Sequence, residues 1–247
     1  MGSIAAIIVV IGIVVAIFGA MQKYKAGRLS KAPFVSTGDA ATKGAQLAGP
    51  RGALSAQGDV VVQQALRSPV TGTECLYYEL KVVGEWKDGD STKSKDYVDE
   101  KACAEFFLND GSGAVRVDAS QGGDFDPFTK TFEESKKEGF LADLKGAVGK
   151  NEAIQFGHYA FVNPTLSKAS KFTCIERVMP VQNRLYVCGR HEGNLITSPK
   201  FASLVMSAKS RDELMGSAAK TAKLCLMGGA AAAVAGTLLG VVSSLIG

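Results

Sequence analysis

Few residues in this 247-residue chain have the type and spacing that catalysis or metal binding requires. The two histidines, His158 and His191, have no partner at metal-ligand spacing and belong to no HExxH motif. The five cysteines form no CxxC pair, which is typical of buried thiols in a reducing compartment. No GxSxG sequence marks a hydrolase serine. We therefore expect a protein that is not an enzyme and holds no cofactor and no metal ion.

One glycine-containing segment, 109–113 (NDGSG), has two interpretations. Adjacent glycine amides can cradle an anion. Alternatively, Asp110 bonds to its neighbouring backbone while a glycine takes a positive φ, which makes the segment a tight turn. We favour the turn, because a lone GxG is weak evidence for a ligand loop. If the chain were an enzyme, Cys188, His191 and Asp110 would be the candidates for a perturbed acid, base or nucleophile.

The chain begins and ends in apolar sequence. Residues 4–21 and 224–246 contain no charged side chain. At about 1.5 Å per residue, a helix of either length crosses a bilayer core of roughly 30 Å. We therefore predict a transmembrane helix over 1–22, and an exit helix followed by a second transmembrane helix over 216–247.

Basic residues lie at the inner ends of both apolar segments. No acidic residue occurs before Asp39. The basic residues after the first segment are Lys23, Lys25, Arg28 and Lys31, and those before the second are Lys209, Arg211, Lys220 and Lys223. Because such residues favour the cytoplasmic side, we expect a two-pass integral membrane protein, of a bacterial inner membrane, with a cytoplasmic central domain. The alternative is an extracytoplasmic domain, with these side chains snorkelling to headgroups.

Small residues recur every four positions in both apolar segments. These residues are Gly12, Ala16 and Ala20 in the first and Ala232, Gly236 and Gly240 in the second. Positions i and i+4 lie on one helical face, so such a ridge lets two helix backbones approach closely. Gly and Ala are also common in membrane helices generally, so the alternative is that this spacing reflects composition and marks no packing face. A packing face would join the two spans of one chain or two copies of a homo-oligomer.

The sequence between the apolar segments predicts a mostly β domain. Residues 23–57 are rich in Gly, Ala and Ser and predict a tether. From 58 to 215, short β-branched runs alternate with turn residues; 76–83 is the clearest strand, and a hairpin is expected around 109–113. A helical pattern predicts an insertion over about 122–150. The predicted fold class is membrane-anchored α+β, with two transmembrane helices flanking a β-rich domain with a helical insertion. A small, partly open barrel of the OB-like kind is one arrangement that its strands could take.

Several motifs resemble one family, the GIDE or beside-a-membrane domain of mitochondrial outer-membrane E3 ubiquitin ligases and their bacterial relatives. Residues 65–78 (ALRSPVTGTECLYY) resemble its L-x-SP-hydrophobic-x-G-x-x-C-hydrophobic-Y-Y signature. Residues 106–118 (FFLNDGSGAVRVD) are similar to its F-x-L-x-D-G-x-G-x-V-x-V-D strand pair. Glu176 and 185–189 (LYVCG) resemble a later strand. The resemblance extends from about Gly52 to the second apolar segment, and the two-span architecture matches it.

The resemblance implies a recognition domain without catalysis. In the ligases, a RING domain with a zinc-binding Cys/His cluster follows the second span. This sequence ends at Gly247 and contains no such cluster, so we expect no ligase activity. The family's motifs imply a recognition surface at Pro69, Thr71, Gly72, Tyr77, Tyr78 and Asp110. Turn and strand residues are expected at these positions even without a ligand.

These observations predict a membrane-anchored interaction or scaffold protein, or a sensor, in an envelope-stress or membrane-remodelling setting. We expect it to bind a protein partner, to self-associate and to bind no nucleic acid. Two other classes stay open. One is a membrane-bound enzyme of unknown reaction. The other is an OB-like barrel that binds nucleic acid, although the mixed charges of 87–101 argue against that partner.

Overall fold

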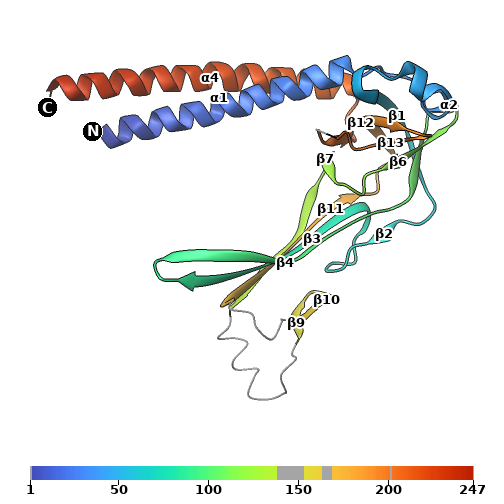
Figure 1. Cartoon of the computed structure of the whole chain (residues 1–247), viewed down its shortest axis with the longest axis horizontal. Coiled ribbons are helices and arrows are strands. Elements are labelled where there is room, and N and C mark those ends of the chain that lie inside the picture. Colours follow the sequence, from blue (N-terminus) through green and yellow to red (C-terminus); the bar gives the residue numbers. More distant parts are fainter. Residues whose placement is uncertain (1, 138–152, 163–168, 201, 247) are drawn as a thin grey trace. The chain divides into compact units, whose positions relative to one another are not determined.

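A computed structural model describes residues 2–137, 153–162, 169–200 and 202–246 of the chain. The chain divides into two compact units (Figure 1). Met1–Phe34 and Lys209–Gly247 form the first unit, and Val35–Ala208 form the second. The first unit is helical and the second consists mainly of strands, so each is described separately.

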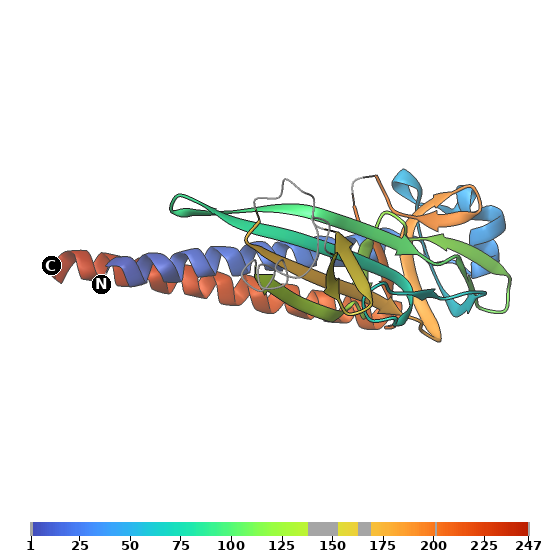
Figure 2. The same cartoon turned by 90° about the horizontal axis from the view of Figure 1, so that it is seen from below.

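The first unit is a pair of long helices. α1 (Gly2–Lys31) and α4 (Arg211–Ile246) lie side by side in both views (Figures 1 and 2). α1 ends just before Pro33, whose ring disfavours a continuing helix. α4 begins with a capping box, in which the Ser210 hydroxyl accepts from the Glu213 amide at 3.3 Å and the Glu213 carboxylate accepts from the Ser210 amide at 2.8 Å. Both helices are long and apolar enough to cross a membrane.

The two helices touch through glycines. A methyl group on Gly12 would lie 2.7 Å from the backbone nitrogen of Ala233, and one on Gly229 would lie 2.7 Å from the carbonyl oxygen of Gly12. A methyl group on Gly19 would lie 3.0 Å from the Cβ atom of Cys225. Because these approaches leave no room for a side chain, the glycines set the separation of the two helices.

On α1 the residues that contact α4 match the predicted ridge at Gly12 and Ala16 but not at Ala20. Gly12 is buried, and the backbone nitrogen of Ala16 lies 2.8 Å from the position of a methyl group on Gly229. Ala20 is exposed, and Gly19 is buried in its place. The reason is that a helix has 3.6 residues per turn, so a contact line between two helices mixes steps of three and four.

On α4 the predicted ridge lies near the contact line. Gly236 is buried and Ala232 is half-buried. Gly240 lies in the last turns of α4, beyond the side chains that the structure describes. The contact that the structure resolves most clearly is at Gly229, one helical turn before Ala232.

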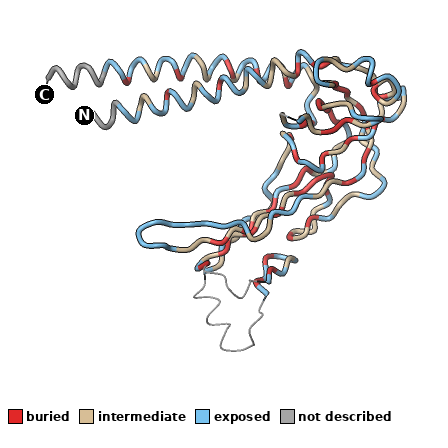
Figure 3. The backbone as a smooth tube through the Cα atoms, viewed as in Figure 1, coloured by how far each residue is buried: buried red, intermediate tan, exposed pale blue. Residues whose placement is uncertain are grey.

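Large apolar side chains cover the outside of the helix pair, where Figure 3 shows mostly exposed residues. These exposed side chains are Ile7, Val10, Ile11, Ile13, Val14, Ile17, Phe18 and Met21 on α1 and Leu224, Met227, Val234 and Leu238 on α4. Exposed apolar surface of this extent is rare on monomeric proteins in water.

The second unit is built on a closed five-stranded barrel. Around the barrel the strands are β1 (Ala53–Val62), β5 (Phe106–Asn109), β6 (Ala114–Asp118), β13 (Leu195–Thr197) and β12 (Arg184–Glu192), which pairs with β1. The β6–β13 pair is parallel and the other four are antiparallel. β14 (Leu204–Ser207) and β7 (Gly123–Asp126) continue the sheet from β12. The hairpin predicted around 109–113 is confirmed as β5–β6.

A helix packs on the barrel where the sequence predicted a tether over 23–57. α2 (Thr37–Leu47) buries Thr37, Ala40 and Gly44 and is followed by a short 3-10 turn, η1 (Pro50–Gly52). The three buried residues recur at helical spacing, but they are small, so their hydrophobic pattern is weak in the sequence. A methyl group on Gly44 would overlap the ring of His191 on β12, so α2 lies directly on the barrel wall.

A second antiparallel sheet extends from the barrel within the same unit. Its strands are β2 (Leu66–Arg67), β3 (Glu74–Asp88), β11 (Lys171–Pro180) and β8 (Thr129–Lys137), and β4 (Ser91–Cys103) also pairs with β3. A hairpin of β9 (Ala153–Phe156) and β10 (Tyr159–Val162) contributes Ile154, Phe156 and Phe161 to the core on one face of this sheet. The unit therefore has two cores, one in the barrel and one beneath the hairpin.

The helical insertion predicted over about 122–150 needs correction. Within this range the structure describes strands β7 and β8, and residues 138–152 lie outside the described residues. From Phe132 onward β8 has an alternating burial pattern, and it pairs with β11 along most of its length. Pairing partners of this kind are distant in the sequence, so the local pattern does not reveal them.

We predict that Gly229→Leu lowers the melting temperature of the detergent-solubilised chain, because a side chain there meets the backbone of α1. The expected destabilisation is about 1–3 kcal/mol. Gly228→Leu is the matched control, since a methyl group on Gly228 meets nothing within 4 Å. Light scattering should give the same mass for both variants. Equal losses in the two variants, or a change of mass in Gly229→Leu alone, would contradict packing within one chain.

Candidate functional site

The two tyrosines of the predicted recognition surface are buried. Tyr77 is 0% exposed in the barrel core, and Tyr78 is 8% exposed in the core of the second sheet. Successive residues of a strand point to opposite faces, so adjacent tyrosines of β3 reach different cores. Their hydroxyls donate to Glu79 at 2.9 Å and Glu100 at 2.5 Å. Burial, reinforced by these carboxylates, raises the pKa of both tyrosines, which therefore stay neutral and link the two cores.

Residues 68–73, which include Pro69, Thr71 and Gly72, form a loop held by the buried carboxylate of Glu176 on β11. Glu176 is 0% exposed. It accepts hydrogen bonds from the Val70 amide at 2.7 Å and the Thr71 hydroxyl at 2.6 Å. The Thr131 hydroxyl on β8 donates a third, at 2.7 Å. The loop, β8 and β11 are thus tied together at one carboxylate.

Glu176 is ionised although it is buried. Burial alone would raise its pKa, but hydrogen bonds from Thr71, Thr131 and Val70 outweigh burial and lower the pKa. A buried carboxylate is tolerated when several donors replace its lost water. The hydroxyl of Thr71 gives its single proton to Glu176, so it accepts from Ser68 and Thr73, whose hydroxyls lie 3.0 and 2.7 Å away. The hydroxyls of the 68–73 loop are therefore oriented by their hydrogen bonds to the Glu176 carboxylate and to one another.

The same loop supports the β9–β10 hairpin. The His158 amide donates to the Val70 carbonyl at 2.9 Å. A methyl group on Gly157 would lie 2.5 Å from that carbonyl oxygen, and Gly157 has φ +54°. Only glycine fits both the close approach and this backbone conformation. His158 thus contributes through its backbone, at the turn of the hairpin.

Asp110 holds α2 against the β5–β6 turn. Its carboxylate accepts from the Thr37 amide at 3.1 Å and from the Ser112 hydroxyl at 2.5 Å. The Thr37 hydroxyl lies 2.7 Å from the Asp110 carboxylate and accepts from the Asp110 amide at 3.0 Å. Gly113 completes the contact, because a methyl group there would lie 3.0 Å from the Cα atom of Gly38.

The charge of Asp110 is stabilised by the same contacts. Burial by itself would raise the pKa of Asp110, but the hydrogen bonds from Ser112 and Thr37 together outweigh burial and hold the pKa well below its usual range. An acidic side chain at the first turn of α2 also complements the positive end of the helix dipole. The interpretation of 109–113 as a turn is therefore confirmed by the β5–β6 pairing, and the turn additionally fastens a helix.

Two of the three residues named as candidates for an acid, base or nucleophile, Cys188 and His191, point away from each other because of the strand geometry. Cys188 and His191 lie on β12, whose pairing with β1 is regular from Arg184 to Arg190. They are three positions apart, so alternation points their side chains to opposite faces. The Nε2 atom of His191 is buried beneath α2 and has no hydrogen-bond partner among the described residues.

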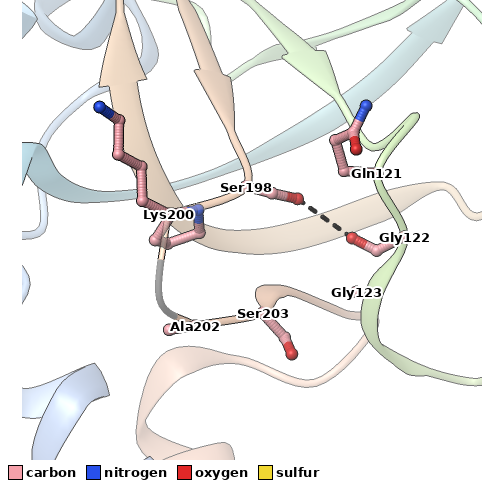
Figure 4. A pocket seen from close by; sticks show the side chains of 8 residues that line it. Gln121, Gly122, Gly123, Ser198, Lys200, Ala202 and Ser203 are labelled. Carbon is pink, nitrogen blue, oxygen red and sulfur yellow. Dashed lines mark hydrogen bonds between the residues drawn. The ribbon is translucent and has the colours of Figure 1, made fainter.

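Two hollows open on the second unit in the part of the chain that the structure describes. The smaller, of 360 Å³, is shown in Figure 4, where the Ser198 hydroxyl donates to the Gly122 carbonyl at 3.1 Å. Its other lining residues are Gln121, Gly123, Pro199, Lys200, Ala202 and Ser203. Apart from Lys200 the lining carries no charged side chain, so it offers no acid–base pair.

The larger hollow, of 910 Å³, lies where β1 leads into β2. Its lining residues are Gln63, Gln64, Ala65, Leu66, Arg67, Glu74, Cys103, Ala104, Glu105 and Phe107. Arg67 is paired with Glu74 at 3.3 Å, and Glu105 with Arg116 at 3.4 Å. Burial raises the pKa of the Cys103 thiol to about 11, so this cysteine is not a thiolate at neutral pH.

The fold thus defines a β-barrel domain whose ends lead into two helices of membrane-spanning length. The family model GIDE, described as E3 ubiquitin ligase, matches residues 85–241, which is more than half of the chain. The chain belongs to the GIDE family, as its motifs predicted. Comparisons with curated proteins and with solved structures gave no match. Within the described residues, no three or more His, Cys, Asp or Glu side chains are grouped to hold a metal ion.

Sequence reasoning named Asp110 but missed Thr37, and it named Glu176 only as part of a motif. A signal for Glu176 exists in β11, where Phe172, Cys174 and Val178 share its face and are buried. A charged residue at such an inward position must find internal partners. No comparable signal exists for Thr37, because its partner lies 73 residues away.

We predict that Glu176→Gln destabilises the domain by about 1–3 kcal/mol at pH 7. The substitution replaces one carboxylate oxygen by an NH₂ group, which cannot accept the hydrogen bonds that the surrounding donors make to Glu176. The effect should depend on pH. The lowered pKa means that the ionised carboxylate stabilises the fold above the unfolded pKa of about 4.3, and that this contribution is lost as the pH falls below it.

The measurement is the difference in melting temperature between wild type and Glu176→Gln from pH 7 to pH 3. The difference should shrink on acidification. Glu133→Gln, on the exposed side of β8, is the control and should change little at pH 7. A difference that stays constant with pH would refute the charged state of Glu176.

We also predict that Thr37→Val loosens α2, since valine keeps the shape of threonine but loses the hydroxyl that bonds to Asp110 and its amide. Removing a buried hydrogen-bonding group costs about 1–3 kcal/mol. Hydrogen exchange of the α2 amides should accelerate while exchange in β3 and β11 is unchanged. Thr42→Val, an exposed position of the same helix, is the control. Uniform acceleration throughout the domain would instead indicate global destabilisation.

Proposed function

We propose that this chain is a non-catalytic, two-span membrane protein whose β domain is an interaction module or scaffold, with a sensing role in envelope stress or membrane remodelling. The observation that carries the proposal is the helix pair. Glycines face the contact line while twelve large apolar side chains are exposed on the outside of the described helices. This arrangement suits two helices that pack on each other within lipid.

The internal use of the family's motifs supports a non-catalytic role. Glu176 and Asp110, two carboxylates of these motifs, are both occupied by hydrogen bonds within the domain. Cys188 and His191 point to opposite faces of β12 and cannot form a nucleophile–base pair. A membrane-bound enzyme is the alternative, and the larger hollow would be its site.

The exposed surface for a partner is the β3–β4 hairpin. Ser91 to Asp96 at the start of β4 are all exposed. Lys81 lies 3.8 Å from Asp96 and 3.5 Å from Asp99, so charges of both signs alternate here. Charges on an edge strand oppose pairing with unrelated strands. The mixed charges favour a protein partner over nucleic acid, which would need uncompensated positive charge.

The proposal also places the domain in the cytoplasm, because basic residues flank the inner ends of both helices. We expect the chain to stay in the membrane when the membrane is washed with alkaline carbonate. We also expect that trypsin added to intact cells does not cut the chain. In permeabilised cells trypsin should cut at Lys87, Lys93 or Lys95 near the hairpin tip, which are exposed. A variant with glutamine at these three positions should resist that cut. Carbonate extraction would refute the anchor, and cutting in intact cells would refute the orientation.

A further inference from the structure

Four lysines lie at about the same height along the helix pair, directly next to the end of its apolar part that leads into the β domain. The contacts of Gly12 with Ala233 and of Gly19 with Cys225 set an antiparallel register between α1 and α4. Continuing this register, Lys220 lies level with about residue 24, and Lys223 lies one helical turn nearer the apolar end. Lys23 and Lys25 of α1 therefore share a level with Lys220 and Lys223 of α4.

Three of these four lysines carry uncompensated charge. Lys23, Lys220 and Lys223 are exposed, and none forms an ion pair with a described carboxylate. The sequence contains no acidic residue over 1–38 or over 214–247. We call Lys23, Lys220 and Lys223 the basic collar. The positive charge of the collar attracts anionic ligands.

An aromatic side chain lies at the same level. Tyr24 is 64% exposed beside Lys23, and Met21 and Leu224, 64% and 63% exposed, begin the apolar surface next to it. Tyrosines favour the boundary between hydrocarbon and headgroups. The collar is therefore placed where lipid phosphates lie, if the helices span a membrane.

We propose that the basic collar binds the phosphate groups of anionic phospholipids and gives the chain a preference for them over zwitterionic ones. This inference rests on the membrane anchoring in the proposed function. Each lysine near a bilayer surface contributes to the attraction, by roughly fivefold in affinity. The collar is formed jointly by both helices, so it exists only when α1 and α4 are packed together.

The test uses the full chain in nanodiscs made from equal amounts of dioleoyl-phosphatidylglycerol and dioleoyl-phosphatidylcholine. Native mass spectrometry then measures which lipids stay bound to the protein. We expect wild type to retain phosphatidylglycerol preferentially. The variant Lys23→Gln, Lys220→Gln, Lys223→Gln should lose that preference by roughly tenfold or more. Substituting arginine at the same three positions should preserve it.

The matched control removes the same charge elsewhere, as Lys87→Gln, Lys93→Gln, Lys95→Gln at the tip of the β3–β4 hairpin, and should behave as wild type. No preference in wild type, or an equal loss in the control, overturns the collar. If millimolar inorganic phosphate abolishes the preference, the ligand is free phosphate and the lipid assignment is wrong. Failure to enter nanodiscs overturns the membrane anchor itself, and the collar with it.

Discussion

The carboxylate of Glu176 is the interaction on which the second unit depends. It lies in β11 at the middle of the second sheet and is fully buried, yet it carries a charge. A buried charge must be surrounded by donors, so the backbone of the 68–73 loop and a hydroxyl of β8 are drawn to it. The loop in turn receives the β9–β10 hairpin through Val70. Four segments distant in the sequence are thus positioned by one group.

The same principle operates at Asp110. Both carboxylates belong to motifs that a family comparison would present as binding residues, and in both the acceptor atoms are used inside the fold. The motif residues Glu176 and Asp110 therefore hold the fold of this chain together. The start of β4 differs, because Ser91 to Asp96 are exposed and Asp96 pairs with Lys81 across the sheet.

The helix pair follows a different constraint, because its closest described contacts lie at glycines and small residues. Glycines at positions 12, 19 and 229 allow backbones to approach, and the larger apolar residues are left on the outside. In lipid, close packing replaces the hydrophobic effect as the source of specificity.

The sequence by itself determined the elements whose pattern is local. The two apolar helices, the strand containing 76–83 and the β5–β6 hairpin follow from apolar length, β-branched residues and turn glycines, and so does the family through its motifs. Only the tertiary structure decided that 37–47 is a helix, that 129–137 is a strand and that the motif residues bond internally. Each of these depends on a partner far along the chain, which gives short segments a stability that their own periodicity does not reveal.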